Sequence, residues 1–214
     1  LEFADRTELS QIADEIEKVI SRLADSFNVG NAIKNGVPVA IIGETNAGKS
    51  TLLNALLNEE KAIVSDIHGT TRDVIEDTIN LRGITFRFID TAGIRQTTDV
   101  VESIGIERTF QKMNQADIVL WMIDSDSEVD MEALKDEILP HCEDKNLIIL
   151  FNKSDKVSTE RCDTLRQAFA EVNAPKLFLS AKQRQGLEEL EALLVETAAL
   201  PEISQNDVIV TNIR

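Results

Sequence analysis

Residues 43–50 read GETNAGKS, and this short stretch decides the fold. Its glycines, lysine and serine match the G-x-x-x-x-G-K-S pattern of a loop that binds phosphate. The pattern is informative only between a strand and a helix, and VPVAII precedes it while a helix is predicted from about Lys49. In such a loop, backbone N–H groups and the helix N-terminus hold phosphates, and Lys49 reaches the β and γ phosphates. The alternative, a chance strand–turn–helix rich in glycine, is disfavoured by this context.

Further from the loop, hydrophobic segments alternate between the periods of strands and helices. Strands are predicted at residues 37–42, 117–124, 146–151 and 176–180, and a hairpin at residues 73–81 and 84–90 around Arg82 and Gly83. Strands that alternate with helices predict an α/β fold with a mostly parallel six-stranded sheet and helices on both faces. The hairpin adds one antiparallel edge strand.

The segment before the loop has the period of an amphipathic helix. Residues 7 to about 34 carry apolar side chains three and four positions apart, with Thr7 as the expected N-cap and Asn35 and Gly36 at the end. The stripe consists of Leu9, Ile12, Ile16, Val19, Leu23 and Phe27. We therefore expect a helical extension ahead of the α/β domain.

The composition indicates a soluble globular protein. The 214 residues suffice for one domain with some extension, 43% are hydrophobic, and no apolar run is long enough to span a bilayer. No secretory signal opens the sequence, and Cys142 and Cys162 lack metal-binding spacing. We expect reduced thiols in a cytoplasmic protein without membrane contact. The net charge of −16 argues against unaided binding of a nucleic-acid backbone.

Two segments after the loop have the residues that a γ-phosphate and Mg²⁺ require. The sequence DTAG follows a predicted strand, so Asp90 can reach the shell of a Mg²⁺ ion and the Gly93 N–H can meet the γ-phosphate. The Ser50 hydroxyl is the expected direct ligand. Thr70 and Thr71 lie before the hairpin, where a hydroxyl would complete the coordination only while the γ-phosphate is present.

Two later segments predict which base is bound. The sequence NKSD follows the strand at residues 146–151 and ends at Asp155, whose carboxylate can accept from guanine N1–H and N2–H₂. Adenine offers no such pair of donors, so the sequence predicts selection of GTP. The sequence SAK at residues 180–182 closes the last predicted strand, where a base needs backbone N–H groups. Each segment alone could be a solvated loop, but five in this order predict a GTP site.

This order of motifs resembles the translation-factor-like branch of P-loop GTPases and, more closely, the tRNA-modification GTPase family called MnmE or TrmE. The resemblance is carried by GETNAGKSTLLNALL, AIVSDIHGTTRDVIED and IDTAGIRQTTDVVESIGIERT. It implies a P-loop GTPase (G) domain at residues 37–200. Residues 1–36 would be a helical-domain stub, and residues 201–214 a stub leading back to an absent helical domain.

The resemblance also implies function. The family is cytoplasmic and acts with a flavin-dependent partner protein to modify the wobble uridine of certain tRNAs at carbon 5. Its G domain pairs transiently with a second copy, and we expect tRNA to contact the absent domains or the partner. Carried over, the Mg²⁺ ligands are Ser50 and Thr71. The contacts to GTP or GDP fall on Asn46, Ala47, Gly48, Lys49, Ser50, Thr51, Ser65, Asp66, Ile67, His68, Gly69, Thr70, Thr71, Asp90, Thr91, Ala92, Gly93, Asn152, Lys153, Asp155, Ser180, Ala181 and Lys182.

Asn46 places a hydrogen-bond acceptor in a loop that needs donors. Ile94 stands where small signalling GTPases carry a glutamine that orients water, and Arg72 and Arg95 stay open as candidates for an arginine finger. In the resembling family this asparagine binds K⁺, and the other ligands, carried over, are Ser65, Ile67 and Thr70. A K⁺ ion would stand where the guanidinium of an arginine finger does. The alternative is that Asn46 only hydrogen-bonds its own loop.

Alignment with the family places the catalytic glutamate at Glu102, which joins Lys49 and Asn46 as the expected catalytic residues. An ionised carboxylate could orient the attacking water directly or through a second water. The alternative is a solvated acid at a helix start, stabilised by the helix dipole. His68 is expected to be solvated and not to act as a base.

Two other functions are consistent with the same motifs. A ribosome-assembly GTPase switch of the same branch would usually add a basic RNA-binding domain, which the acidic ends do not suggest. A non-catalytic GTP-binding scaffold could dimerise through the long helix, and GTP turnover would distinguish it.

Overall fold

The computed structural model describes residues 9–20, 35–59, 77–89, 110–111 and 113–198. By its internal contacts the chain divides into two units, Gly36–Ala199 and one formed by Leu1–Asn35 with Leu200–Arg214. In the second unit residues 9–20 are helical, as expected, and five apolar side chains are 53–64% exposed: Leu9, Ile12, Ile16, Val19 and Ile20. Leu23 and Phe27 lie outside the described residues. The assignment of the flanks to a helical domain stays a prediction.

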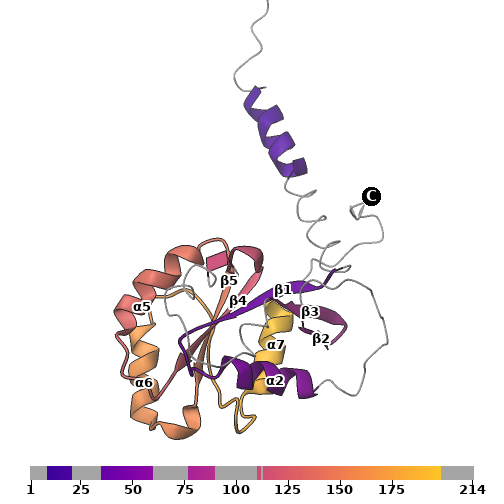
Figure 1. The fold of residues 1–214 in the computed structure, drawn as a ribbon. Helices are drawn as coiled ribbons and strands as arrows, with labels where there is room; N and C mark the ends of the chain where they lie inside the picture. The colour runs from indigo at the N-terminus through magenta and orange to yellow at the C-terminus, as the bar shows by residue number, and fades with distance from the viewer. Residues whose placement is uncertain (1–8, 21–34, 60–76, 90–109, 112, 199–214) are drawn as a thin grey trace, which may run out of the picture. The chain divides into compact units, whose positions relative to one another are not determined.

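Six strands form one sheet in the order β2-β3-β1-β4-β5-β6 (Figure 1). Their bounds are β1 Val37–Ile42, β2 Asp77–Leu81, β3 Ile84–Phe88, β4 Ile118–Asp124, β5 Asn146–Asn152 and β6 Lys176–Phe178. Every neighbouring pair is parallel except β2 and β3. The predicted fold class is therefore confirmed, including the single antiparallel edge strand.

The burial of each strand follows its place in the sheet. All six residues of β1 and six of the seven in β4 are buried, because helices cover both faces of a central parallel strand. The edge hairpin of β2 and β3 instead alternates, with Ile79 and Phe86 buried between more exposed neighbours. Its two-residue turn has φ of +51° at Arg82 and +87° at Gly83, the left-handed pair that suits a twisted hairpin.

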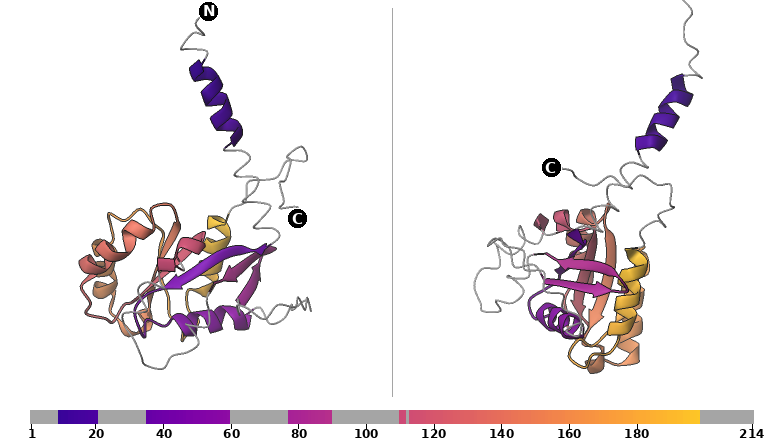
Figure 2. Two further views of the ribbon diagram at one scale, coloured as in Figure 1. Left: turned by 45° about the horizontal axis from the view of Figure 1, so that its top comes forward. Right: turned by 90° about the vertical axis from the view of Figure 1, so that its right-hand side faces the viewer.

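The helices pack on both faces of the sheet (Figures 1 and 2). They are α2 Lys49–Glu59, α5 Met131–Ile138, α6 Thr159–Ala168 and α7 Leu187–Thr197, with short 3₁₀ turns η1 Leu139–His141 and η2 Ser154–Lys156. One core cluster joins Ile138 and Leu165 of α5 and α6 to strand residues such as Trp121. The buried leucines of α2 and α7 stand outside that cluster, which places them on the other face.

Aromatic rings form the centre of the α5–α6 side. Phe169 meets Trp121 and Phe151 edge to face, with ring centroids 5.5 and 5.4 Å apart. All three rings are at most 1% exposed, so they belong to the core. In the described ranges, no helix is both long and apolar enough to cross a membrane.

Candidate nucleotide-binding site

The predicted site residues that are described gather where the parallel strands end. β1, β4, β5 and β6 run in one direction, so the loops that follow them emerge at the same edge of the sheet. The loop at residues 43–48 follows β1, residues 153–155 follow β5, and residues 180–182 come two residues after β6. β6 is shorter than the predicted strand, because Ser180 makes only an isolated bridge to Gln185.

The phosphate-binding loop is packed so closely that two positions require glycine. Gly43 has φ +138°, and a Cβ there would lie 2.1 Å from the Met122 carbonyl oxygen. Gly48 has φ +103°, and a Cβ there would lie 2.2 Å from Asn152 Nδ2. Any larger residue would displace the loop from β4 or β5, so both glycines hold the loop against the sheet.

Lys49, the first residue of α2, is anchored to the loop. Its Nζ donates to the carbonyl oxygens of Gly43 at 2.7 Å and Glu44 at 2.6 Å. The helix starts directly behind it, with the Leu52 N–H bonded to the Gly48 carbonyl at 2.9 Å. The first turn of α2 contains no acidic residue. The ammonium, the helix dipole and the N–H groups of the first turn therefore form a positive cradle for phosphate.

Asn46 has an ordinary structural reason to be an asparagine. Its φ is +65°, in the left-handed region that asparagine tolerates better than most residues. The residue is exposed, and among the described residues its side-chain amide makes no hydrogen bond. The expected alternative, a side-chain bond within its own loop, is not observed there. The amide oxygen is therefore accessible to a ligand.

The Asn152 side chain connects three of the predicted segments by hydrogen bonds. The sequence alone does not predict this connection. Asn152 is 3% exposed, its Nδ2 donates to the Ala47 carbonyl at 2.7 Å, and its Oδ1 accepts from the Ala181 N–H at 3.0 Å. The sequence predicts Asn152 and Ala181 only as nucleotide contacts. Here they bind each other, because a buried amide at the end of an apolar strand must be satisfied. An asparagine directly after five buried strand residues was the signal that could have indicated this role.

Asp155 presents its carboxylate to solvent. It lies in η2 and is exposed, and among the described residues it makes no hydrogen bond or ion pair. Two residues earlier, Lys153 adopts a left-handed φ of +61° and forms an ion pair with Asp124 at 2.5 Å. The Asp155 oxygens are thus available to a pair of donors such as those of guanine.

The segment at residues 180–182 forms a tight loop that is held by local hydrogen bonds. Ser180 is fully buried, exchanges two backbone hydrogen bonds with Gln185 at 3.0 and 3.1 Å, and its Oγ accepts from the Gln183 N–H at 3.2 Å. Lys182 is exposed. This tight loop gives a rigid wall beside Asn152, with Lys182 facing outward.

A part of the predicted site lies outside the described residues and stays a prediction. These residues are Ser65, Asp66, Ile67, His68, Gly69, Thr70, Thr71, Asp90, Thr91, Ala92, Gly93 and Glu102, together with the candidates Arg72 and Arg95.

The described residues fit a Mg²⁺ ion that is held mainly by a nucleotide. Ser50 is the second residue of α2, half-buried beside Lys49, and supplies a hydroxyl oxygen. Across the described ranges, no group of three or more His, Cys, Asp or Glu side chains could form a complete metal cage. Mg²⁺ commonly uses one or two protein ligands plus phosphate oxygens, which agrees with this arrangement.

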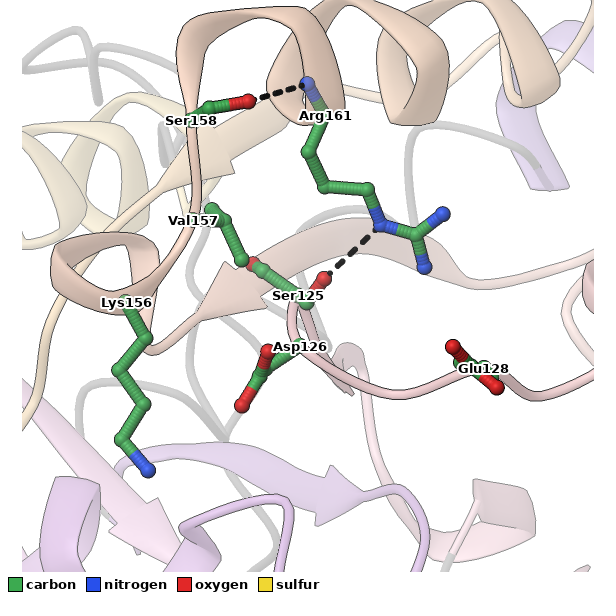
Figure 3. A pocket seen from close by; sticks show the side chains of 7 residues that line it. All are labelled: Ser125, Asp126, Glu128, Lys156, Val157, Ser158 and Arg161. Carbon is green, nitrogen blue, oxygen red and sulfur yellow. Dashed lines mark hydrogen bonds between the residues drawn. The ribbon is translucent and has the colours of Figure 1, made fainter.

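A hollow of about 340 Å³ borders η2, the turn that contains Asp155 (Figure 3). It is formed by the turn after β4 and the start of α6. Arg161 crosses it, donating from Nε to the Ser125 carbonyl at 3.1 Å, while Ser158 caps α6 by accepting from the Arg161 N–H at 3.3 Å. Asp126 and Glu128 line it together with Lys156 and Arg161, so its charges are mixed. The hydrogen bond from Arg161 holds the turn after β4 against the start of α6.

The sheet order, the phosphate loop between β1 and α2 and the exposed Asp155 after β5 are those of a P-loop GTPase domain. Residues 38–153 match the family model described as 50S ribosome-binding GTPase, and the chain belongs to this GTPase family. Along its whole length the chain is 69% identical to tRNA modification GTPase MnmE of Phocaeicola vulgatus and 63% identical to that of Bacteroides thetaiotaomicron. The resemblance to the MnmE G domain is therefore confirmed, and the chain carries a GTPase domain.

These relatives are longer than the chain, which covers 43% and 47% of their lengths. Among solved structures, the chain is similar to the translation elongation factor SelB of Methanococcus maripaludis, solved with the GTP analogue GppNHp. The TM-score is 0.59 at 18% identity, over 79% of this chain and 35% of the other. This likeness supports the fold.

Proposed function

We propose that the chain is the GTP-hydrolysing domain of a tRNA-modifying GTPase, switched by K⁺ and by pairing with a second copy. The observation that carries the proposal is the 69% identity, over the full chain, to a protein named as a tRNA modification GTPase. The modified atom would be carbon 5 of the wobble uridine. The modification itself would need a flavin-dependent partner protein, and the tRNA would bind to that partner or to other domains.

In this proposal the described residues bind and orient GTP. The N-terminus of α2 and the Lys49 ammonium hold the β and γ phosphates, and Ser50 with Thr71 holds Mg²⁺. Asp155 accepts from guanine N1–H and N2–H₂. Support comes from Lys49, whose ammonium lies over the loop carbonyls, and from Asp155, whose exposed carboxylate has no partner in the described part of the chain.

Asn46 would hold K⁺ together with Ser65, Ile67 and Thr70. The support is chemical: its exposed amide oxygen is a hard ligand in the phosphate-binding loop, and among the described residues that amide has no partner. A cation there would offset charge that develops between the β and γ phosphates. Glu102 would orient the attacking water.

The test is GTP turnover by the 214-residue chain with K⁺ or Na⁺ as the only monovalent cation. We expect turnover in K⁺ to exceed that in Na⁺ by at least about tenfold, the scale of one well-placed electrostatic group. Asn54→Ala, at an exposed position of α2 outside the predicted GTP contacts, is the matched control for Asn46→Ala and should keep the K⁺ response. Equal rates in the two salts would remove the cation from the mechanism.

The family description favours one alternative partner, the large ribosomal subunit. Co-sedimentation with 50S subunits in the presence of a non-hydrolysable GTP analogue would distinguish this ribosomal function from the proposed tRNA-modifying function. Under the proposal the chain does not pellet with the subunits. Pelleting that needs GTP and is lost in Lys49→Ala would instead favour the ribosomal function.

A further inference from the structure

The Arg161 guanidinium binds the turn that follows β4 with two of its nitrogens. Nε donates to the Ser125 carbonyl at 3.1 Å (Figure 3), and Nη2 donates to the Ser127 carbonyl at 2.5 Å. Arg161 is half-buried in the first turn of α6, three residues after the N-cap Ser158. Because the guanidinium is a planar fork with fixed donor directions, these two bonds hold the start of α6 on that turn in one orientation.

The same turn holds the end of β5. The Ser125 N–H donates to the Asn152 carbonyl at 2.9 Å, and Asp124, the last residue of β4, pairs in register with Asn152. The turn itself is closed by Asp124, whose Oδ1 accepts from the Asp126 N–H at 3.1 Å and whose carbonyl accepts from the Ser127 N–H at 3.2 Å. The turn after β4 is therefore a common support for the end of β5 and the start of α6.

Asp155 lies in the segment between these two supported points. Residues 153–158 connect β5 to α6, and Asp155 is the middle residue of η2. The Ser154 N–H donates to the Leu179 carbonyl at 3.1 Å, which holds the start of η2 from the side of β6. Among the described residues the Asp155 side chain makes no hydrogen bond of its own. The position of its carboxylate therefore also depends on how the far end of the segment, at α6, is held.

We propose that Arg161 is a positioning residue for guanine-nucleotide binding: by holding the start of α6 on the turn after β4, it fixes the Asp155 carboxylate where both guanine donors can reach it. This inference rests on the proposed assignment of the base site to Asp155. In the absence of the two Arg161 bonds, the binding nucleotide would have to order the segment at residues 153–158, which costs affinity. The helix itself would persist, because Leu165 of α6 is 1% exposed in the core.

Arg161 should affect mainly the preference for guanine. The two donors of guanine, N1–H and N2–H₂, need a carboxylate in one fixed position, whereas hypoxanthine offers only N1–H and tolerates a less ordered carboxylate. The diphosphate is common to GDP and inosine diphosphate, so loss of the Arg161 charge alters the attraction of both nucleotides equally. The ratio of the two affinities therefore reports on Asp155 and cancels a general effect of charge.

The first measurement is the binding of GDP and of inosine diphosphate to the 214-residue chain. In Arg161→Ala we expect the preference for GDP to fall about threefold to tenfold, the scale of ordering a flexible side chain on binding. Arg166→Ala is the matched control: it removes a guanidinium from the same helix, where that group pairs with Asp163 and lies over the Phe178 ring. Its preference should stay within about twofold of wild type. An unchanged preference in Arg161→Ala would overturn the proposal.

The second measurement asks whether Arg161 acts through Asp155. In an Asp155→Asn background, Arg161→Ala should cause no further fall in the preference, because the group that it positions is already lost. A fall of undiminished size in that background would overturn the proposal. Wild-type chain without a preference for GDP, or an Asp155→Asn variant that keeps it, would refute the proposed base site and this inference with it. An unchanged preference in Arg161→Ala alone refutes only the inference.

Arg161→Lys separates the planar fork from its charge. It keeps the positive charge and most of the stem, but a single nitrogen replaces the two donor nitrogens. The preference for GDP should lie between those of Arg161→Ala and wild type. A wild-type preference would show that the charge alone suffices and would overturn the proposal. The lysine variant also decides the question if Arg161→Ala lowers the melting temperature of the nucleotide-free chain.

Discussion

The side-chain amide of Asn152 donates to the backbone carbonyl of Ala47 at 2.7 Å, across 105 residues of sequence. The same side chain accepts from the Ala181 N–H at 3.0 Å. One buried residue thus ties the phosphate loop to the NKSD and SAK segments, which are predicted to border the base. Loss of the Asn152 side chain should therefore disturb the phosphate loop and the segment at residues 180–182 together.

Asn152→Ala should destabilise the domain and weaken nucleotide binding together. It leaves the Ala47 carbonyl and the Ala181 N–H without their buried partner, at a cost of roughly 2–4 kcal/mol in the free energy of unfolding. Urea denaturation measures this loss. Asn173→Ala, an exposed asparagine between α6 and β6, is the control and should change stability by less than about 0.5 kcal/mol. If Asn152→Ala leaves the free energy of unfolding unchanged, the hydrogen bonds of Asn152 to Ala47 and Ala181 contribute little to stability.

Asp155→Asn should lower GTP affinity by about 10²–10⁴-fold, because an amide cannot accept from both guanine donors. Xanthosine triphosphate, which has a carbonyl at position 2, should bind better to the variant than to wild type. Calorimetric titration of wild type and variant with GTP and with xanthosine triphosphate measures the change in the two affinities. Asp136→Asn, on the exposed side of α5, is the control. Unaltered GTP affinity would remove Asp155 from the base site.

Glu102→Ala should leave nucleotide affinity nearly intact and lower turnover by about 10²–10⁴-fold, as for other positioned acid–base groups. Single-turnover hydrolysis in K⁺ separates the chemical step from binding. Glu188→Ala, exposed at the start of α7, should behave as wild type. If both variants hydrolyse GTP at the same rate, the water must be oriented by another residue.

Asn46→Ala should abolish the response to K⁺ but keep binding of Mg²⁺ and nucleotide through Lys49 and Ser50. We expect wild-type chain to be monomeric with GDP, and to dimerise when K⁺ and GDP with aluminium fluoride are both present, through a two-fold contact. Light scattering of wild type and variant in K⁺ and Na⁺ measures this. A dimer of equal strength in Na⁺, or a variant that still responds to K⁺, would contradict the role given to Asn46.

Cys142 should make the domain less stable at high pH. Burial raises the pKa of its thiol from 9.0 to about 11. Between these values the unfolded thiol ionises while the folded one keeps its proton, so the folded state binds more protons and the free energy of unfolding falls as pH rises. The loss should be on the order of 1–3 kcal/mol by pH 11. Denaturation of wild type and Cys142→Ala from pH 8 to 11 measures it, and parallel curves would exclude the effect. The chain contains no tyrosine, so no phenol titrates in the same window.

Much of the fold could be predicted because its signals are local. Periodicity within single segments located the strands, and the turn at Arg82 and Gly83 located the antiparallel edge. The GETNAGKS and NKSD segments likewise indicated their predicted roles, because the residues of each motif lie within eight positions of one another. The helix before residue 36 was predicted from the same kind of signal, and residues 9–20 are helical.

The sequence by itself determined the fold class and the phosphate loop, because backbone propensity and short motifs act over a few residues, and it predicts Asp155 as the carboxylate for guanine. Only the tertiary structure decided how these parts are joined. The Asn152 bridge spans 105 residues and the Asp124–Lys153 pair spans 29. Such contacts depend on which strands become neighbours, and β1 lies between β3 and β4 only after the whole sheet has formed. A buried polar group must find a partner, but the chain order does not say which one, since the partner is set by the packing of strands distant in sequence.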